Sequence, residues 1–183
     1  MEFIPTHIEG LYTIRLKKLE DERGLFARTF CKNEFSQIGF DKEFVQFNHS
    51  FNKHKGTVRG MHFQNTPYCE TKLIRCILGS VYDVAVDLRK RSPTFLQYFG
   101  IELNSENMYS ILIPEGFAHG FQTLEDNSAL IYHHTQYYTP NADAGVRFDD
   151  PALDIHWILP AVMISEKDKS YKLIDVSFKG ITL

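Results

Sequence analysis

The sequence predicts an all-β protein, a small barrel or jelly roll with an open mouth. Short apolar or alternating runs recur along the chain, and turn-forming residues separate them, as in sandwiches and barrels. Aromatic residues make up 14% of the chain, with 15 Phe and 9 Tyr, and they favour strands and the walls of pockets that stack flat ligands. No repeat, linker or low-complexity stretch interrupts the 183 residues, so we expect one domain over 1–183.

Seven apolar runs are the expected strands, and two polar segments are the expected helices. A further strand-like stretch at 59–64 concentrates polar residues where a core strand would be apolar. Residues 33–38 predict a short helix that ends near Gly39, and 165–173 predict a second helix with Ser165 as its cap. The seven runs are 10–16, 24–30, 72–78, 81–87, 95–103, 109–113 and 129–134.

Composition excludes several classes of protein. A net charge of -3 argues against a general nucleic-acid binder, which usually carries a basic excess. No apolar run approaches the roughly 20 residues that a membrane span needs, and the first residues lack the features of a signal peptide. Cys31, Cys69 and Cys76 show no CxxC spacing, which favours reduced thiols. We therefore expect a cytoplasmic protein that does not bind membranes.

His62 and Lys72 are the first candidates for chemistry. His62 lies in the stretch Arg-Gly-Met-His-Phe-Gln, and Lys72 begins the next apolar run. An isolated histidine on a strand is most often a core residue, and a lysine among apolar neighbours can simply face outward. If both side chains face one cavity, they supply a base and a fixed cation. That pair suits proton removal next to a carbonyl, because the cation stabilises the enolate.

Asp83 and His119 are expected to line the same cavity. Asp83 lies inside an apolar strand, where a buried carboxylate needs a partner such as a histidine, whereas Asp87 fits a cap at the strand end. His119 follows a turn with the spacing P-x-G-x-x-H, which occurs in the second motif of metal-binding cupins. The first such motif contains H-x-H, but Gln64 replaces its second histidine here. A usable metal site needs at least three converging ligands, so we expect none.

Two further segments have both a structural and a chemical interpretation. Tyr132 and His134 share one face of a strand by alternation, and His133 faces the other way. Tyr132 could be a packing residue or a proton donor opposite a base. Asp168 could merely sit in the first turn of a helix capped by Ser165, or it could reach a histidine and raise its basicity.

Taken in order, these motifs resemble those of the dTDP-4-dehydrorhamnose 3,5-epimerase family. No single motif is decisive, but the ordered set is specific and extends from about residue 5 to about residue 170. The motifs are D-x-R-G at 21–24, Q-x-N-x-S at 46–50, R-G-x-H-x-Q at 59–64, K-L-x-R at 72–75, D-V-x-V-D-x-R at 83–89, S-P-T at 92–94, P-x-G-F-A-H-G-F at 114–121, Y-Y-x-P at 137–140 and S-x-K-D at 165–168.

The resemblance implies a metal-free and cofactor-free cupin-type jelly roll, a homodimer, that acts on nucleotide-diphosphate-linked 4-keto-6-deoxyhexoses. It implies that His62 is the base and Asp168 its partner. Lys72 stabilises the enolate oxygen, and Tyr132 returns a proton from the opposite face. The substrate-binding residues that it implies are Arg23, Phe26, Arg28, Gln46, Asn48, Arg59, Asp83, His119 and Tyr138.

The chain departs from the usual family sequence at three positions. Arg28 replaces a glutamate associated with reading thymine, which leaves the nucleotide open. Glu70 replaces a commoner glutamine, and His133 a commoner lysine. We expect a role in making deoxysugars for a cell-surface glycan or a glycosylated metabolite. The alternatives are a 3-only or 5-only epimerase, a 3,4-ketoisomerase of the same fold, a metal-dependent cupin enzyme and a non-catalytic sugar-binding cupin.

Overall fold

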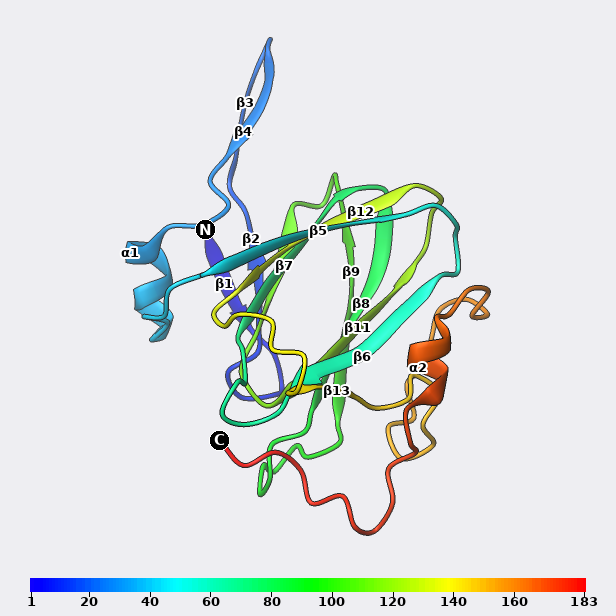
Figure 1. Cartoon of the computed structure of the whole chain (residues 1–183). Helices are drawn as coiled ribbons and strands as arrows, with labels where there is room; N and C mark the ends of the chain where they lie inside the picture. Colours follow the sequence, from blue (N-terminus) through cyan, green and yellow to red (C-terminus); the bar gives the residue numbers. More distant parts are fainter.

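Two antiparallel sheets face each other in the computed structural model, which describes residues 1–183 (Figure 1). Every pair of neighbouring strands is antiparallel, which confirms the all-β jelly-roll class. The six-stranded sheet has the order β1 (Glu2–Pro5), β2 (Tyr12–Arg15), β10 (Tyr109–Ile113), β7 (Lys72–Leu78), β12 (Ser128–His134) and β5 (Gln46–Asn52). The five-stranded sheet has the order β13 (Asp143–Gly145), β6 (Val58–Gln64), β11 (Phe117–Thr123), β8 (Ser80–Asp87) and β9 (Tyr98–Asn104).

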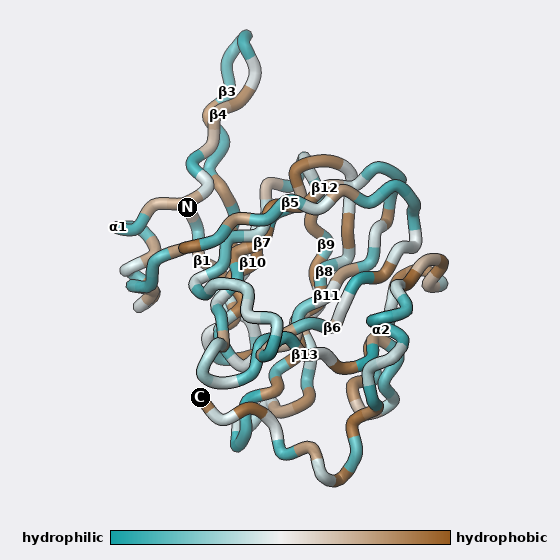
Figure 2. Tube along the Cα trace, viewed as in Figure 1, coloured by the Kyte–Doolittle hydropathy of each residue, from teal (hydrophilic) through white to brown (hydrophobic).

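The main core lies between the two sheets, and β8 shows how alternation builds it. Val81 and Ala85 point inward and pack with residues of the facing sheet such as Ile74. Val84 and Val86 point to the other face and pack under the C-terminal segment. Both faces of β8 are therefore buried, which explains its nearly continuous apolar sequence. Figure 2 shows the same pattern as hydrophobic colour along the inner strands.

Three smaller elements lie outside the sheets. The hairpin of β3 (Lys18–Asp21) and β4 (Gly24–Ala27) projects away from the barrel and ends in a hydrophilic tip (Figures 1 and 2). The helices α1 (Lys32–Phe35) and η1 (Ser36–Ile38) pack Phe35 against the outer face of the six-stranded sheet. The helix α2 (Glu166–Ser170) lies beside β6. None of these helices has the length and apolar character that crossing a bilayer requires.

Two of the predicted strands agree with the structure residue for residue, whereas β11 (Phe117–Thr123), which is buried along its whole length, was not predicted as a strand. The runs 72–78 and 109–113 are strands with those bounds. The first helix ends at Gly39, whose φ of 78° is left-handed, and Ser165 caps the second helix by accepting a hydrogen bond from the Asp168 amide. Four predictions were too long. The strand expected at 10–16 covers only Tyr12–Arg15, and the strand expected at 95–103 begins at Tyr98. The strand expected at 24–30 ends at Ala27, and the helix expected at 165–173 ends at Ser170, because the next residue is extended.

Candidate active site

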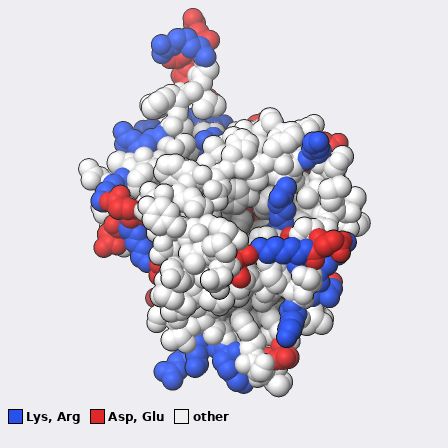
Figure 3. Space-filling model, viewed as in Figure 1, with Lys and Arg blue, Asp and Glu red and all other residues white.

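A cavity of about 330 Å³ opens between the two sheets. Figure 3 shows a hollow near the centre of this view, with Lys and Arg side chains along one side of it. Polar residues line most of the cavity, which sets it apart from the apolar core deeper in the barrel. Seven of the residues expected at the site are among its walls: Asn48, Arg59, His62, Lys72, His119, Tyr132 and Tyr138.

Close contact between β6 and β11 places two histidines side by side. A Cβ on Gly60 would lie 2.5 Å from the Cα of Gly120, and the φ of Gly60 is +129°, so glycine is needed at this crossing. In this register His62 of β6 lies opposite His119 of β11. The glycine of the R-G-x-H motif therefore sets the position of the histidine that follows it.

His62 is paired with Asp168, as expected. Its Nε2 lies 2.7 Å from Asp168 Oδ1, and the Gly60 amide donates to the other carboxylate oxygen at 3.2 Å. Burial acts to raise the pKa of Asp168, but the hydrogen bond and charge of His62, with the Gly60 amide, hold that pKa below its usual value. An ionised Asp168 accepts the Nε2 proton, which leaves Nδ1 of His62 as the basic nitrogen.

Lys72 brings a positive charge into the cavity from the facing sheet. Its side chain is 8% exposed, and Nζ donates to the backbone oxygen of His62 at 3.3 Å. Its counter-ion is Glu70, whose Oε1 lies 3.2 Å away. A buried ammonium group requires such a partner, and here it stands next to the proposed base.

Tyr132 faces His62 across the cavity. It belongs to β12 of the six-stranded sheet, whereas His62 belongs to β6 of the five-stranded sheet. The Tyr132 hydroxyl lies 3.1 Å from Ser50 Oγ, and burial raises the pKa of the phenol above its usual value. Tyr132 is therefore protonated at neutral pH and can act as a proton donor from the wall opposite His62.

His119 and Asp83 form a second, fully buried pair. The His119 Nε2 lies 2.9 and 3.1 Å from the two oxygens of Asp83. Burial lowers the pKa of His119 even though Asp83 opposes the shift, so its ring is neutral at neutral pH. This contact is the histidine partner expected for Asp83. The cap expected of Asp87 is also present, since its carboxylate accepts hydrogen bonds from the amide and side chain of Arg89.

A row of polar side chains continues along the cavity from His62 and Lys72. The Arg59 Nε donates to Asn52 Oδ1 at 2.7 Å, which orients a guanidinium group along the wall. Gln46 accepts from the backbone amide of Tyr138 at 3.0 Å and donates to Asn48 Oδ1 at 3.3 Å. Arginine and amide groups in this arrangement suit a diphosphate and a base edge.

Five of the nine expected substrate-binding residues do not line this cavity. Gln46 and Asp83 contact residues that line it, whereas the other three lie farther away. Arg23, Phe26 and Arg28 belong to or adjoin the projecting β3–β4 hairpin (Figure 1). Arg23 pairs with Asp21, Arg28 donates to Glu34 at 2.7 Å, and Phe26 is 68% exposed. The order of motifs along a sequence does not say whether a hairpin folds back onto its own barrel, and here it points away.

Nine of the residues that line the cavity were missing from the expected set, and four of these form pairs with each other. Glu70 and His134 meet inside it, and Asp143 and Lys167 form an ion pair at its wall. The sequence did contain one signal: Glu70 is two residues before Lys72, so alternation predicts that both side chains share a face. No group of three or more metal-ligating side chains is present that could hold a metal ion.

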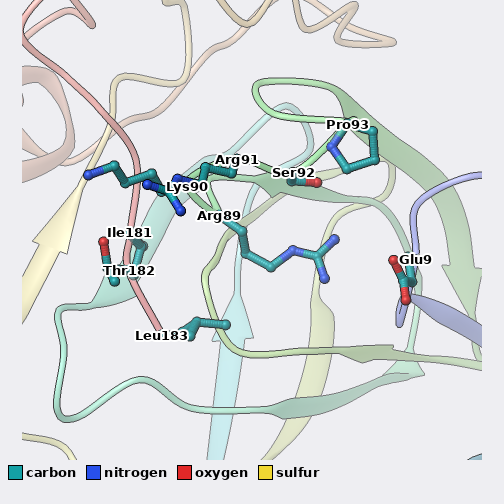
Figure 4. A pocket seen from close by; sticks show the side chains of 9 residues that line it. All are labelled: Glu9, Arg89, Lys90, Arg91, Ser92, Pro93, Ile181, Thr182 and Leu183. Atoms are coloured by element: carbon teal, nitrogen blue, oxygen red, sulfur yellow. The ribbon is translucent and has the colours of Figure 1, made fainter.

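A second pocket of about 510 Å³ lies at the end of β8, under the C-terminal segment (Figure 4). Arg89 reaches across it, but its guanidinium group already binds Asp87 and stacks 4.7 Å above the Phe117 ring. Ser92 and Thr94 complete the hydrogen bonds of Asp87. The side chains of this pocket therefore have a structural role, which is to hold the end of β8 and the C-terminal segment together.

The profile of the family described as dTDP-4-dehydrorhamnose 3,5-epimerase matches residues 5–175. The chain is 39% identical over 180 residues to the dTDP-4-dehydrorhamnose 3,5-epimerase of Shigella flexneri, covering 97% of this chain and 99% of that one. It is 43% identical over 173 residues to the enzyme of that name from Methanothermobacter thermautotrophicus, covering 93% and 92%. It is 33% identical over 175 residues to a dTDP-4-dehydrorhamnose 3-epimerase of Streptomyces niveus, covering 95% and 84%.

Solved structures match the whole barrel. A dTDP-4-dehydrorhamnose 3,5-epimerase from Bacillus anthracis with TDP and PPi bound superposes with a TM-score of 0.92 at 38% identity, covering 94% of this chain and 99% of that one. A dTDP-6-deoxy-D-glucose-3,5-epimerase from Legionella pneumophila in complex with dTDP-4-keto-L-rhamnose also gives 0.92 at 38% identity, covering 98% and 97%.

Proposed function

Because the chain belongs to the dTDP-4-dehydrorhamnose 3,5-epimerase family, we propose that it epimerises a nucleotide-linked 4-keto-6-deoxyhexose at C3 and C5. One observation carries the proposal: the His62–Asp168 pair on one wall faces Tyr132 on the other, with the Lys72 ammonium group beside them. A base and an acid on opposite sides of a sugar ring invert a carbon, whereas a base alone returns the proton to the same side.

The roles follow from the contacts of each side chain. Nδ1 of His62 takes a proton from the carbon next to the C4 ketone, and Asp168 stabilises the imidazolium ion that forms. The electrons move to the ketone oxygen, where the Lys72 charge stabilises the enolate. The Tyr132 hydroxyl then gives a proton to the carbon from the other face. The substrate is already a ketone, so the step needs no cofactor.

Proton NMR in deuterated water tests this function directly. With dTDP-4-keto-6-deoxyglucose as substrate, we expect deuterium at both C3 and C5 and the product of double inversion. If the substrate is recovered unchanged, with no deuterium at C3 or C5, the protein is not an epimerase of this substrate.

The main alternative is inversion at a single centre. It is favoured by the similarity to the 3-epimerase of Streptomyces niveus, but that relative is 33% identical, against 39% and 43% for the 3,5-epimerases. The NMR experiment separates the two, because a 3-epimerase gives product with the original configuration at C5.

We further propose that the nucleotide part of the substrate is dTDP, as the names of the relatives indicate. Arg28 stands where the family usually has glutamate, and its charge is partly offset by Glu34 at 2.7 Å. Calorimetric titration with dTDP and UDP tests the choice. Tighter binding of UDP would reverse it.

A homodimer would explain the projecting hairpin, and we propose that its residues complete the cavity of a neighbouring copy. The hairpin exposes Leu19, Leu25 and Phe26, each more than half accessible. The edge strand β5 exposes Phe47 and Phe51 beside the cavity. Exposed apolar groups of this kind mark interaction surfaces. Light scattering on the purified protein should give twice the chain mass of 21.3 kDa.

The remaining proposals concern setting and cofactors. Three free cysteines support a cytoplasmic enzyme. Residues between 48 and 168 build one cavity, which supports a single domain. We propose that no metal takes part, since His62 and His119 each hold a separate carboxylate, and chelation should leave turnover unchanged. The product class fits deoxysugar assembly for a cell-surface polysaccharide.

A further inference from the structure

A hydrogen-bonded network runs along the cavity from the buried side chains of Lys72, Glu70 and His134 to Asn48, which is exposed. Neither Glu70 nor His134 has a role in the mechanism above. Glu70 Oε1 lies 3.2 Å from Lys72 Nζ, and its Oε2 lies 2.8 Å from His134 Nδ1. His134 Nε2 lies 3.2 Å from Asn48 Nδ2. Both Glu70 and His134 have side chains only 10% exposed, and both line the cavity.

The direction of each hydrogen bond in this network can be assigned. Asn48 Oδ1 accepts from Gln46 Nε2, so the Asn48 amide nitrogen is free to donate to Nε2 of His134. His134 must then carry its proton on Nδ1, which donates to Glu70. Burial acts to raise the pKa of Glu70, but the His134 hydrogen bond and the Lys72 charge hold that pKa below its usual value. Glu70 is therefore an ionised carboxylate that accepts hydrogen bonds from Lys72 and His134.

Strand register keeps this network in place. His134 of β12 lies directly opposite Lys72 of β7 and opposite Gln46 of β5. The His134 ring also stacks on Tyr132, with centroids 6.1 Å apart and planes 17° from parallel. Lys72, His134 and Asn48 are thus fixed by strands, and Glu70, two residues before β7, is held by its contacts with Lys72 and His134. Contacts of this kind are what holding a reacting group requires.

We propose that Glu70 and His134 are a positioning pair, with Glu70 holding Lys72 at the enolate oxygen and His134 holding Asn48 at the nucleotide part of the substrate. The inference rests on the proposed epimerase function. The two residues have different roles. Of the pair, only Glu70 contacts Lys72 and only His134 contacts Asn48. Loss of Glu70 leaves a buried ammonium group without its counter-ion.

The test is the split between kcat and KM. In Glu70→Ala, we expect kcat to fall about tenfold or more, with KM within about threefold of wild type. In His134→Ala, we expect KM and the Kd for dTDP to rise about tenfold, with kcat within about threefold. Glu70→Gln keeps an acceptor oxygen and should recover part of the kcat lost in Glu70→Ala. If Glu70→Ala fails to fold, Glu70→Gln replaces it in the test. His134→Gln replaces His134→Ala in the same way.

Matched controls are available on the surface. Glu43 pairs with Lys32 outside the cavity, and the His156 side chain is 79% exposed. Glu43→Gln and His156→Ala should leave both constants unchanged. Variants of Glu70 and His134 that match wild type, or that lower kcat and raise KM together with no recovery in Glu70→Gln, would overturn the positioning roles. Wild-type protein without turnover or dTDP binding would instead remove the epimerase function, and the inference with it.

Discussion

The cavity and the β3–β4 hairpin carry residues assigned to the same substrate, yet they are built in opposite ways. In the cavity, two strands and the helix α2, far apart in sequence, bring His62, Tyr132 and Asp168 together, and each makes a hydrogen bond with a neighbouring side chain. In the hairpin, Arg23 pairs only with a residue two positions away, and Phe26 contacts solvent. The groups proposed for proton transfer all come from one chain, whereas the hairpin contacts no cavity of its own chain. On the proposed function, the first region carries the chemistry and the second contributes substrate binding to a neighbouring copy.

Replacing His62 should separate the two regions most clearly. His62→Ala removes the base, and loss of a general base costs on the order of 10²–10⁴ in rate. Binding of dTDP should persist, because the nucleotide contacts lie elsewhere. Steady-state turnover and calorimetry measure the two effects. A variant that turns over at nearly the wild-type rate would exclude His62 as the base.

Tyr132→Phe should uncouple exchange from inversion. The enolate still forms beside Lys72, so deuterium from solvent enters at C3 or C5. It returns only from the His62 side, so the configuration is kept. The change removes one hydroxyl that contacts Ser50, and a melting curve checks that the fold survives. Inversion at the wild-type rate would show that Tyr132 is only a packing residue and that His134 or a water supplies the proton.

Mixing a hairpin variant that binds substrate weakly with an inactive His62 variant tests whether the hairpin serves a neighbouring copy. Arg23→Ala with Phe26→Ala should raise KM about tenfold or more through lost contacts to the nucleotide. Unfolding and refolding that variant together with His62→Ala forms mixed dimers. In these, one cavity has its own His62 and receives an intact hairpin from the other chain. We expect activity at low substrate concentration to return on mixing. Activity equal to the sum of the separate variants would place the hairpin outside the partner's cavity.

The sequence predicted the cavity better than its surroundings, because the alternation of residues along a strand shows which side chains share a face. Tyr132 and His134 share a face and His133 does not, which period-2 geometry alone predicts. The strand β5 escaped prediction for the same reason. Its polar residues line the cavity and its phenylalanines are exposed, so it lacks the apolar face of a core strand.

The hairpin residues show what a single sequence leaves open. Leu25 and Phe26 form a short apolar run like that of a buried strand, but both side chains are exposed in this chain. The spacing of Glu70 from Lys72 predicts that the two side chains share a face. The contact of Glu70 with His134 depends on the pairing of β7 with β12, which no local pattern encodes.

The smallest expected effect compares one aspartate from each region. Asp168 and Asp21 both have pKa values below their usual range. For Asp168, burial opposes the shift and His62 with Gly60 produces it, whereas the Arg23 side chain and amide produce it for the exposed Asp21. A lowered folded-state pKa gives stability that is present above the unfolded value of about 3.9 and is lost as pH falls toward the folded value. Asp168→Asn should therefore flatten the fall in the free energy of unfolding below about pH 4. Asp21→Asn should not, since solvent screens an exposed pair. Urea denaturation across this pH range measures both, and equal curves for the two variants would contradict the distinction between a buried site and an exposed hairpin.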